Sequence, residues 1–320
     1  MSDFLKRAAQ TPLQGFYLAA GARCLLATNF EPILAAARRG LLEIDEPSSA
    51  VDFNLRFWVD SDGQSQPPWP KPYFRGLDHL VFAGFNSENS MLIDLRTRRA
   101  IGRFSPALAA DQAYWETVIF PTLLSVMGAT AGVTGLHCGC VVRNGGGLLL
   151  CGRSGSGKST LTLALARKGF SFLSDDWTYF SRSDGQLHAW GLATRLKLLP
   201  DAPQFFPELD GFEVGVSLNG EPAYEVDPVL QLGIARTRCC DPRWLIFLER
   251  QSAPAFHLTR APAMEASTRL EEDLLAETAE LPSPQLSIIE SLAGRECWLL
   301  QYGGDPETAA QSLADLCRGA

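Results

Sequence analysis

The pattern of apolar and polar positions changes character near residue 130, which predicts an α+β part at 1–130 and an α/β core at 131–320. In the first part, residues 32–39 repeat apolar positions at helical spacing, while residues 51–59 alternate as a half-buried strand does. Residues 61–72 are rich in Pro, Gly and Ser and predict a loop. The other predicted elements of this part are strands at 79–82, 91–95 and 100–104 and one long helix at 107–127.

The second part has more apolar strands around one clear helix. Residues 135–142 and 147–151 are β-rich runs joined by an Asn-Gly-Gly turn, which predicts a hairpin. Residues 159–168 predict a helix that Gly169 closes, and residues 170–174 predict a strand. Later predicted elements are strands at 187–190, 244–248 and 297–301 and a closing helix at 305–317, with Asp305 as its N-cap.

Composition and charge exclude several classes of protein. The chain has 320 residues, a net charge of −8 and 46% apolar residues. An acidic chain without a long basic stretch is a poor general binder of nucleic acid, which requires clustered Lys and Arg. No run approaches the length of about 18 apolar residues that a membrane-spanning helix needs, and the N-terminus lacks the apolar segment of a signal peptide. We expect a cytoplasmic protein with no membrane or nucleic-acid partner.

The eight cysteines give no metal-binding pattern. They are spread along the chain, and neither the Cys138/Cys140 pair nor the adjacent Cys239 and Cys240 has the spacing of paired zinc ligands. Buried free thiols in a reducing compartment are the expected state.

Residues 152–159 read Gly-Arg-Ser-Gly-Ser-Gly-Lys-Ser, which is a complete phosphate-binding loop (P-loop) motif between a predicted strand and a predicted helix. Glycines let backbone N–H groups turn toward anionic oxygens, and the N-terminus of the following helix adds its free N–H groups and its dipole. Lys158 can reach the β- and γ-phosphates of ATP, and the Ser159 hydroxyl can bind Mg²⁺. The alternative is a Gly/Ser-rich turn with an incidental lysine. The residues predicted to hold the nucleotide are Gly152, Ser154, Gly155, Ser156, Gly157, Lys158, Ser159 and Thr160.

Two adjacent carboxylates, Asp175 and Asp176, end the next predicted strand. A right-handed strand–helix–strand crossover brings both strand ends to the same edge of a sheet, so the pair is expected beside the loop. Carboxylates there suit two tasks in phosphoryl transfer, which are holding Mg²⁺ and accepting a proton from an attacking hydroxyl. The alternative is a turn that caps the following segment.

The predicted hairpin brings one more titratable group to this edge. We place a two-residue turn at 145–146, which pairs Arg143 with Leu148. The same register pairs His137 with Ser154, within reach of the γ-phosphate or of an aspartate. The alternative is a core histidine bonded to the backbone.

Four pieces of the sequence, in order, resemble the HPr kinase/phosphorylase family and most of all its HPr kinase-related kinase branch. They are His137 before the loop, the loop itself, the Leu-Ser-Asp-Asp-Trp strand end and the basic segment 195–200. Arg195 and Lys197 in that segment alternate along a predicted strand, so they share one face. Lys197 stands where the resemblance leads us to expect an arginine.

The resemblance implies a kinase core of the P-loop fold shared by HPr kinase and phosphoenolpyruvate carboxykinase. It implies that ATP and Mg²⁺ are used to phosphorylate a Ser or Thr hydroxyl of a peptide or protein. It gives Asp175 the role of base, gives Asp176 and Ser159 the role of Mg²⁺ ligands, and gives His137 and Lys197 assisting roles. Family members often form rings, so a homo-oligomer is an expected state, whereas the segment used for phosphorolysis is not found.

Other functions fit the same motifs. An ATP-gated protein that binds a peptide without phosphorylating it is one alternative, and a kinase or carboxykinase of small molecules is another. We expect the acceptor to bind in a groove between residues 1–130 and the core, where an extended peptide could pair with a strand edge. The alternative is that residues 1–130 only cover the core or form an oligomer contact.

Overall fold

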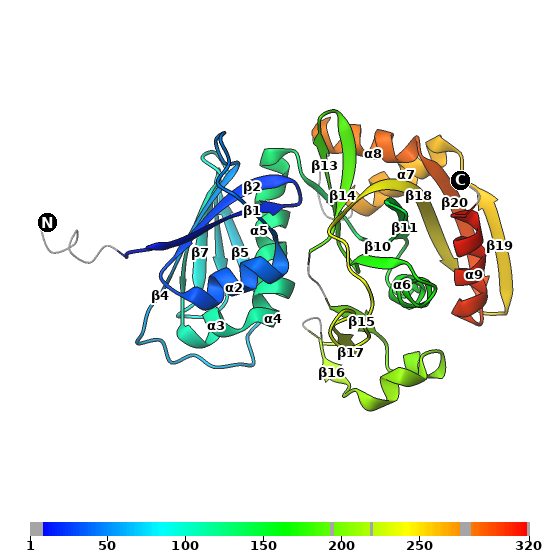
Figure 1. The fold of residues 1–320 in the computed structure, drawn as a ribbon, viewed down its shortest axis with the longest axis horizontal. Coiled ribbons are helices and arrows are strands. Elements are labelled where there is room, and N and C mark those ends of the chain that lie inside the picture. The colour runs from blue at the N-terminus through cyan, green and yellow to red at the C-terminus, as the bar shows by residue number, and fades with distance from the viewer. Residues whose placement is uncertain (1–8, 193–194, 218–219, 276–282, 319–320) are drawn as a thin grey trace, which may run out of the picture. The chain divides into compact units, whose positions relative to one another are not determined.

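The chain divides into two compact units, Met1–Val133 and Thr134–Ala320, which Figure 1 colours from blue to green and from green to red. Strands and helices are mixed in both units, so the protein is of the α/β kind. Across the described ranges, no helix is both long and apolar enough to cross a membrane. The computed structural model describes residues 9–192, 195–217, 220–275 and 283–318.

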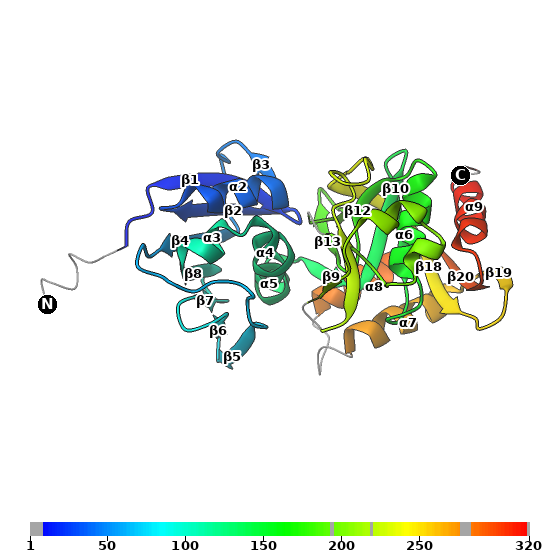
Figure 2. The same cartoon turned by 90° about the horizontal axis from the view of Figure 1, so that it is seen from below.

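The first unit is built on an eight-stranded mixed sheet in the order β3-β1-β2-β4-β8-β7-β6-β5, seen in Figure 2. β4 pairs in parallel with β2 and β8, and the other neighbours are antiparallel. The strands are β1 Leu13–Ala19, β2 Ala22–Thr28, β3 Leu42–Ile44, β4 Phe53–Val59, β5 Tyr73–Leu77, β6 Leu80–Gly84, β7 Ser90–Asp94 and β8 Arg99–Phe104. The helices are α2 Glu31–Gly40, α3 Pro106–Ala110, α4 Gln112–Tyr114 and α5 Phe120–Met127.

Most predictions for this unit are confirmed, because its helices and strands follow the expected periodicities. The helix at 32–39 is α2, and the strands at 51–59, 79–82, 91–95 and 100–104 are β4, β6, β7 and β8 within a few residues. Strands β1, β2, β3 and β5 are not predicted by the sequence pattern.

The single long helix predicted at 107–127 is wrong. Asp111 leaves the helical region, with φ −77° and ψ 85°, and its carboxylate caps α4 by accepting from the Tyr114 N–H at 3.0 Å. A π-helical turn at Trp115–Ile119 then precedes α5. Pro121 follows that π-helical turn, and the helical backbone continues from Gln112 to Met127. The cap at Asp111 therefore divides a segment whose apolar spacing is continuous.

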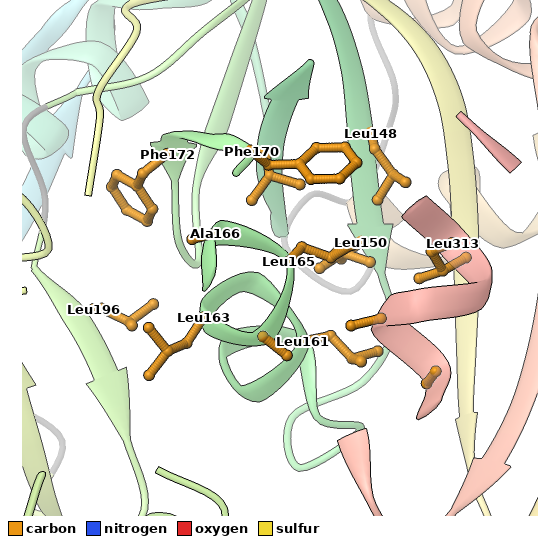
Figure 3. Packing of buried hydrophobic residues seen from close by; sticks show 14 of the residues in the cluster. Leu148, Leu150, Leu161, Leu163, Leu165, Ala166, Phe170, Phe172, Leu196 and Leu313 are labelled. Carbon is orange, nitrogen blue, oxygen red and sulfur yellow. The ribbon is translucent and has the colours of Figure 1, made fainter. Parts of the chain in front are cut away.

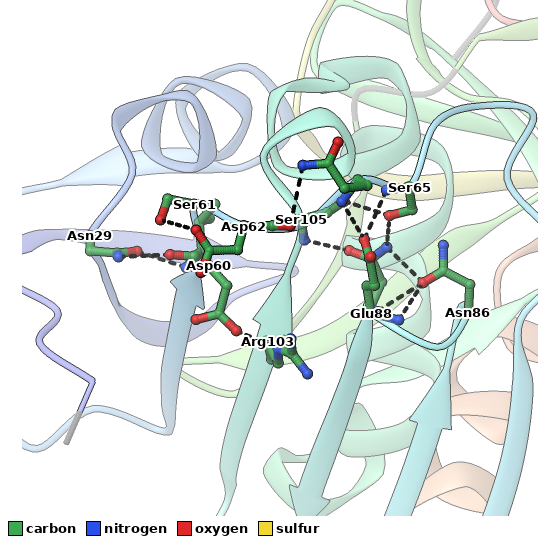
Figure 4. A network of polar contacts seen from close by, with 12 residues as sticks. Asn29, Asp60, Ser61, Asp62, Ser65, Asn86, Glu88, Arg103 and Ser105 are labelled. Atoms are coloured by element: carbon green, nitrogen blue, oxygen red, sulfur yellow. Dashed lines mark hydrogen bonds and ion pairs between the residues drawn. The ribbon is translucent and has the colours of Figure 1, made fainter. Parts of the chain in front are cut away.

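The predicted loop at 61–72 is held to the sheet by polar side chains, several of which Figure 4 shows. Glu88 accepts hydrogen bonds from the N–H groups of Gln64 and Ser65 at 2.9 and 2.8 Å. Asn89 is fully buried, and its amide joins Ser65 to the Ser105 N–H. Side-chain hydrogen bonds thus hold in place a loop that has few apolar residues to bury.

The second unit contains a nine-stranded sheet in the order β12-β10-β11-β18-β14-β13-β9, with β20 beside β18 and β19 beside β20. β11 runs parallel to β18, whereas β10 is antiparallel to both β11 and β12. β12 therefore points the same way as β11, with β10 between them. The strands are β9 Thr134–Leu136, β10 Cys138–Arg143, β11 Gly146–Cys151, β12 Ser171–Ser174, β13 Thr178–Ser183, β14 Gln186–Trp190, β18 Cys239–Arg250, β19 Ala255–Arg260 and β20 Glu296–Gly303. A small separate sheet contains β15 Leu196–Leu198, β16 Gly215–Val216 and β17 Pro222–Val226.

Alternate side chains of the central strands enter two cores, one on each face of the sheet. Leu148 and Leu150 of β11 join the core that contains α6 and α9, while Leu149 and Cys151 join the core that contains α7 and α8. Figure 3 shows α6 packed among leucines and phenylalanines of the first core. All eight cysteines are free and all but Cys239 are buried, as predicted. The helices are α6 Lys158–Arg167, α7 Ala263–Leu275, α8 Ser283–Ala293 and α9 Pro306–Leu316.

The hairpin is confirmed, but its predicted register is wrong by two residues. Arg143 pairs with Gly146 rather than with Leu148. The turn consists of Asn144 and Gly145, both with positive φ (50° and 76°), which is the Asn-Gly pattern of a tight hairpin. Because side chains alternate with a period of two, a shift of two residues leaves each side chain on its predicted face.

The apolar run predicted at 135–142 is divided at His137. Its first half is β9, which pairs with β13, and its second half is β10, which pairs with β11 and β12. His137 thus occupies the break between two strands that belong to different ladders.

Candidate functional site

β11 ends at Cys151, and the loop at 152–159, named the glycine loop here, leads into α6. Gly152, Gly155 and Gly157 have φ values of 152°, 78° and 94°, a range that glycine enters without a steric penalty. Lys158 is 5% exposed, and its Nζ donates to the Gly152 carbonyl at 2.6 Å and to the Arg153 carbonyl at 3.3 Å. The ammonium group is therefore held against the backbone of the loop.

Tyr302 of β20 contacts the glycine loop close to the start of α6. Its hydroxyl donates to the Ser156 carbonyl at 3.1 Å, and a Cβ added at Gly157 would lie 1.9 Å from the same hydroxyl oxygen. Gly157 is therefore required for two reasons, its backbone conformation and this close approach. No sequence pattern singles out Tyr302, because β20 lies far along the chain from the motif.

The two aspartates occupy a tight turn between β12 and β13. The Trp177 N–H donates to the Asp175 carbonyl at 2.8 Å, and Asp176 has a left-handed φ of 65°. Thr178 ties this turn to β10 by donating to the Cys138 carbonyl at 2.8 Å. The turn therefore lies at the sheet edge where β11 also ends, and Asp175 senses the charge of Lys158.

Asp175 is buried, with 2% of its surface exposed. Its Oδ2 accepts from the Lys197 N–H at 3.2 Å, whereas its Oδ1 has no hydrogen-bond partner among the described residues. Burial and the charge of Asp176 raise the pKa of Asp175 to about 7, against the lowering effects of the Lys197 N–H, the nearby Ser159 hydroxyl and Lys158. A buried carboxylate oxygen without a partner is costly unless a ligand completes it.

Asp176 is more open and is paired with the predicted histidine. Its Oδ1 lies 3.6 Å from His137 Nε2, and its side chain is 49% exposed. His137 holds the pKa of Asp176 below its usual value. The His137 ring also lies 5.9 Å from the Trp177 ring. The pKa values of the two adjacent carboxyl groups are therefore shifted in opposite directions, as in sites where neighbouring acids perform different tasks.

Lys197 of β15 contacts the site mainly through its backbone. Its N–H donates a hydrogen bond to Asp175, while its Nζ forms an ion pair with Glu221 at 3.0 Å. Its charge also contributes to the lowered pKa of Asp176. Arg195 is exposed and lies just before β15.

Gly139 of β10 is a further residue that the site requires and that the sequence analysis does not identify. A Cβ added there would lie 2.8 Å from Thr162 Oγ1 and 3.7 Å from Asp175 Oδ1. A glycine at this position leaves room for α6 and the buried carboxylate to approach the strand. No sequence signal identifies it, because glycines inside strands also occur at bulges and bends that have no link to a site.

The glycine loop thus has two flanks of different chemistry. The β12 flank contains Asp175, Asp176, His137 and Lys197. The β18 flank contains a cavity of about 600 Å³ between the outer part of the loop, the end of β18 and helix α7. Among its lining residues are Arg153, Ser156, Glu249, Arg250, Arg269, Glu272 and Asp273.

Asp273 of α7 links the two flanks electrostatically and is missed by the sequence analysis. Burial raises the pKa of Asp273, while His137, Lys158 and Arg153 act to lower it. It therefore lies in the field of the same cations as the predicted site. A carboxylate in a helix far from any motif gives no signal in the sequence.

No protein-family model and no curated protein matches the chain. Among solved structures, the Hpr(Ser) kinase/phosphatase from Coxiella burnetii is similar at 14% identity and a TM-score of 0.29, covering 58% of this chain and 95% of that chain.

Proposed function

We propose that this chain is a kinase that uses ATP and Mg²⁺ to phosphorylate a Ser or Thr hydroxyl of a peptide or protein. One observation supports the proposal above all. The glycine loop, the Lys158 ammonium and two aspartates whose pKa values are shifted in opposite directions lie at a single sheet edge. Phosphoryl transfer depends mainly on positioning and on compensating negative charge, and these groups supply both.

The loop suits the triphosphate of ATP. Its positive-φ glycines free backbone N–H groups, and α6 begins directly at Lys158. Lys158 bonds only to carbonyl oxygens of the loop in the contacts described above, and phosphate oxygens are stronger partners for an ammonium group. We expect Lys158 to exchange these carbonyls for the β- and γ-phosphates.

The residues present also fit Mg²⁺. No three His, Cys, Asp or Glu side chains converge as a metal site in the part of the chain that the structure describes. Mg²⁺ is commonly bound by one or two protein oxygens together with substrate phosphates. The unpartnered Oδ1 of Asp175 and the neighbouring Ser159 hydroxyl are two such oxygens. Mg²⁺ bound there would compensate the charge that develops on the phosphates.

The family resemblance gives Asp175 the role of base and Asp176 that of metal ligand, and we propose the reverse. Asp175 is buried next to Ser159, which suits a metal ligand. Asp176 is half exposed and paired with His137, so an incoming hydroxyl could reach it and lose its proton to it. His137 would orient that carboxylate, and Lys197 would hold Asp175 through its N–H.

A binding and transfer experiment tests the function. Calorimetry should show tight binding of ATP that depends on Mg²⁺, and label from the γ-phosphate of ATP should appear in a library of Ser- and Thr-containing peptides. Binding without any transfer would favour the ATP-gated alternative. Absence of ATP binding would remove the proposal. The role of the first unit in acceptor recognition stays a prediction.

A further inference from the structure

The direction of the nucleotide across the glycine loop follows from where the reacting groups lie. This inference rests on the proposed function. Asp175, Asp176 and His137 all lie on the β12 flank, so the γ-phosphate has to face that flank. A triphosphate chain is extended, and its nucleoside end therefore leaves the loop on the opposite side, which is the β18 flank.

The β18 flank has a space of suitable size. The cavity measures about 600 Å³, within the range of pockets that bind small molecules. Its floor is the outer part of the glycine loop, so an occupant would be continuous with a triphosphate on that loop. Ser156 lines it, is 7% exposed, and has no hydrogen-bond partner for its hydroxyl among the described residues. A buried hydroxyl without a protein partner is available to bond a polar ligand.

The acidic residues of the cavity differ in whether their carboxylates already have hydrogen-bond partners. The Glu249 carboxylate has two, because it accepts hydrogen bonds from Arg269 and from Gln301, both at 2.9 Å. Glu272 and Asp273 line the same cavity, and neither side chain forms a hydrogen bond or ion pair within the described ranges. Carboxylates accept hydrogen bonds only, and a ribose offers two adjacent hydroxyl donors. A dinucleotide ribose is recognised by an acidic residue in the same manner.

We propose that this cavity is the nucleoside subsite and that Glu272 and Asp273 accept hydrogen bonds from the ribose hydroxyls. α7 thereby contributes specificity-determining residues to a site whose phosphate and metal contacts come from other elements. The chain should prefer ribonucleotides to deoxyribonucleotides for this reason.

Three probes separate the phosphate contacts from the ribose contacts: ATP, 2′-deoxy-ATP and inorganic tripolyphosphate, each titrated with Mg²⁺ by calorimetry. The full-length protein should bind ATP about tenfold more tightly than 2′-deoxy-ATP, the value of one hydrogen bond to a charged acceptor. In the double variant E272A/D273A that preference should disappear, with tripolyphosphate binding unchanged. Unchanged tripolyphosphate binding also shows that the variant is folded.

Glu271 provides a matched control on the same helix. It is bonded to Ser267 at 2.8 Å and does not line the cavity, so Glu271→Ala should keep the preference for ATP. Equal binding of ATP and 2′-deoxy-ATP by the wild type, or an unchanged preference in E272A/D273A, would overturn the proposal. If that double variant raised the KM of a peptide acceptor and left ATP binding intact, the cavity would belong to the acceptor instead. Failure of both ATP and tripolyphosphate to bind the wild type would instead refute the proposed function itself.

Discussion

The β12 and β18 flanks of the glycine loop are built in opposite ways. On the β12 flank, Asp175 is buried, bonded to a backbone N–H, and close to a second carboxylate. On the β18 flank, a cavity of about 600 Å³ is lined in part by two carboxylates, Glu272 and Asp273, that have no partner among the described residues. Burial raises the pKa of Asp175 and His137 lowers the pKa of Asp176, which suits acid–base chemistry, whereas an open space with polar walls suits a ligand that must enter and leave. Under the proposed function, reaction and nucleotide selection would take place on separate sides of one loop.

The largest effect is expected on the β12 flank. Asp176→Asn should lower phosphate transfer to a peptide library by about 10²- to 10⁴-fold, the usual contribution of a general base. ATP binding and its Mg²⁺ dependence should change little, because Asp176 is paired with His137 rather than with the loop. Rates from labelled ATP and calorimetry with Mg²⁺ are the two measurements. The opposite pattern, with lost Mg²⁺ dependence and retained transfer, would restore the roles implied by the family resemblance.

Lys158→Ala should weaken ATP binding about 100-fold, because a buried charge that contacts phosphate is lost. This effect is common to both flanks, since the lysine lies between them. Lys168→Ala is a suitable control, because Lys168 lies beyond the other end of α6 and pairs with Glu307. The fold of both variants is checked by circular dichroism. Equal ATP affinity in wild type and Lys158→Ala would contradict the assignment of the loop.

Asp175→Asn should stabilise the metal-free protein at pH 8. The pKa of Asp175 is raised to about 7, so between about pH 4 and pH 7 the folded state binds more protons than the unfolded state. Stability is therefore lost as the pH rises through this window, and asparagine avoids the loss. We expect a gain on the order of 4 kcal/mol at pH 8 and none at pH 4, measured by urea unfolding with a chelator present. An equal stability of the two proteins at pH 8 would show that the carboxylate is not penalised by burial.

Binding of Mg²⁺-ATP should itself depend on pH. A protonated Asp175 is a poor metal ligand, and its pKa is raised to about 7, so affinity should fall roughly tenfold for each pH unit below 7. Tripolyphosphate binding without Mg²⁺ should not show this fall below pH 7. Asp175→Asn should flatten the profile of Mg²⁺-ATP binding, and a profile that stays steep in that variant would assign the titration to another group.

The β12 flank could be predicted from the sequence because its residues lie in one continuous segment. The strand–loop–helix–strand order between His137 and Asp176 determines which ends meet, and the structure brings these residues together. The predicted hairpin register is wrong by two residues, and His137 lies outside the observed β10–β11 ladder, in the break between β9 and β10. The partner of His137 is Asp176, whereas the predicted register pairs it with Ser154 in the loop.

The β18 flank could not be predicted in the same way. Asp273 and Tyr302 reach the loop through α7 and β20, whose packing depends on contacts between distant parts of the chain. Gly139 is required only because a buried carboxylate and Thr162 approach it closely. The prediction of one helix at 107–127 is wrong for a different reason, because one capping side chain, Asp111, interrupts the helix although the apolar pattern is continuous. The periodicity of apolar positions does not report contacts between distant parts of the chain or the effect of a single capping residue.

The most direct test of the division between the two flanks is a crystal structure of the protein with Mn²⁺ and a non-hydrolysable ATP analogue. We expect an anomalous peak at about 2 Å from the Asp175 carboxylate and the Ser159 hydroxyl. We also expect a γ-phosphate that faces Asp176 and a ribose in the cavity beside Glu272 and Asp273. A metal bound away from Asp175, or a nucleoside that lies over the β12 flank, would contradict the proposed division.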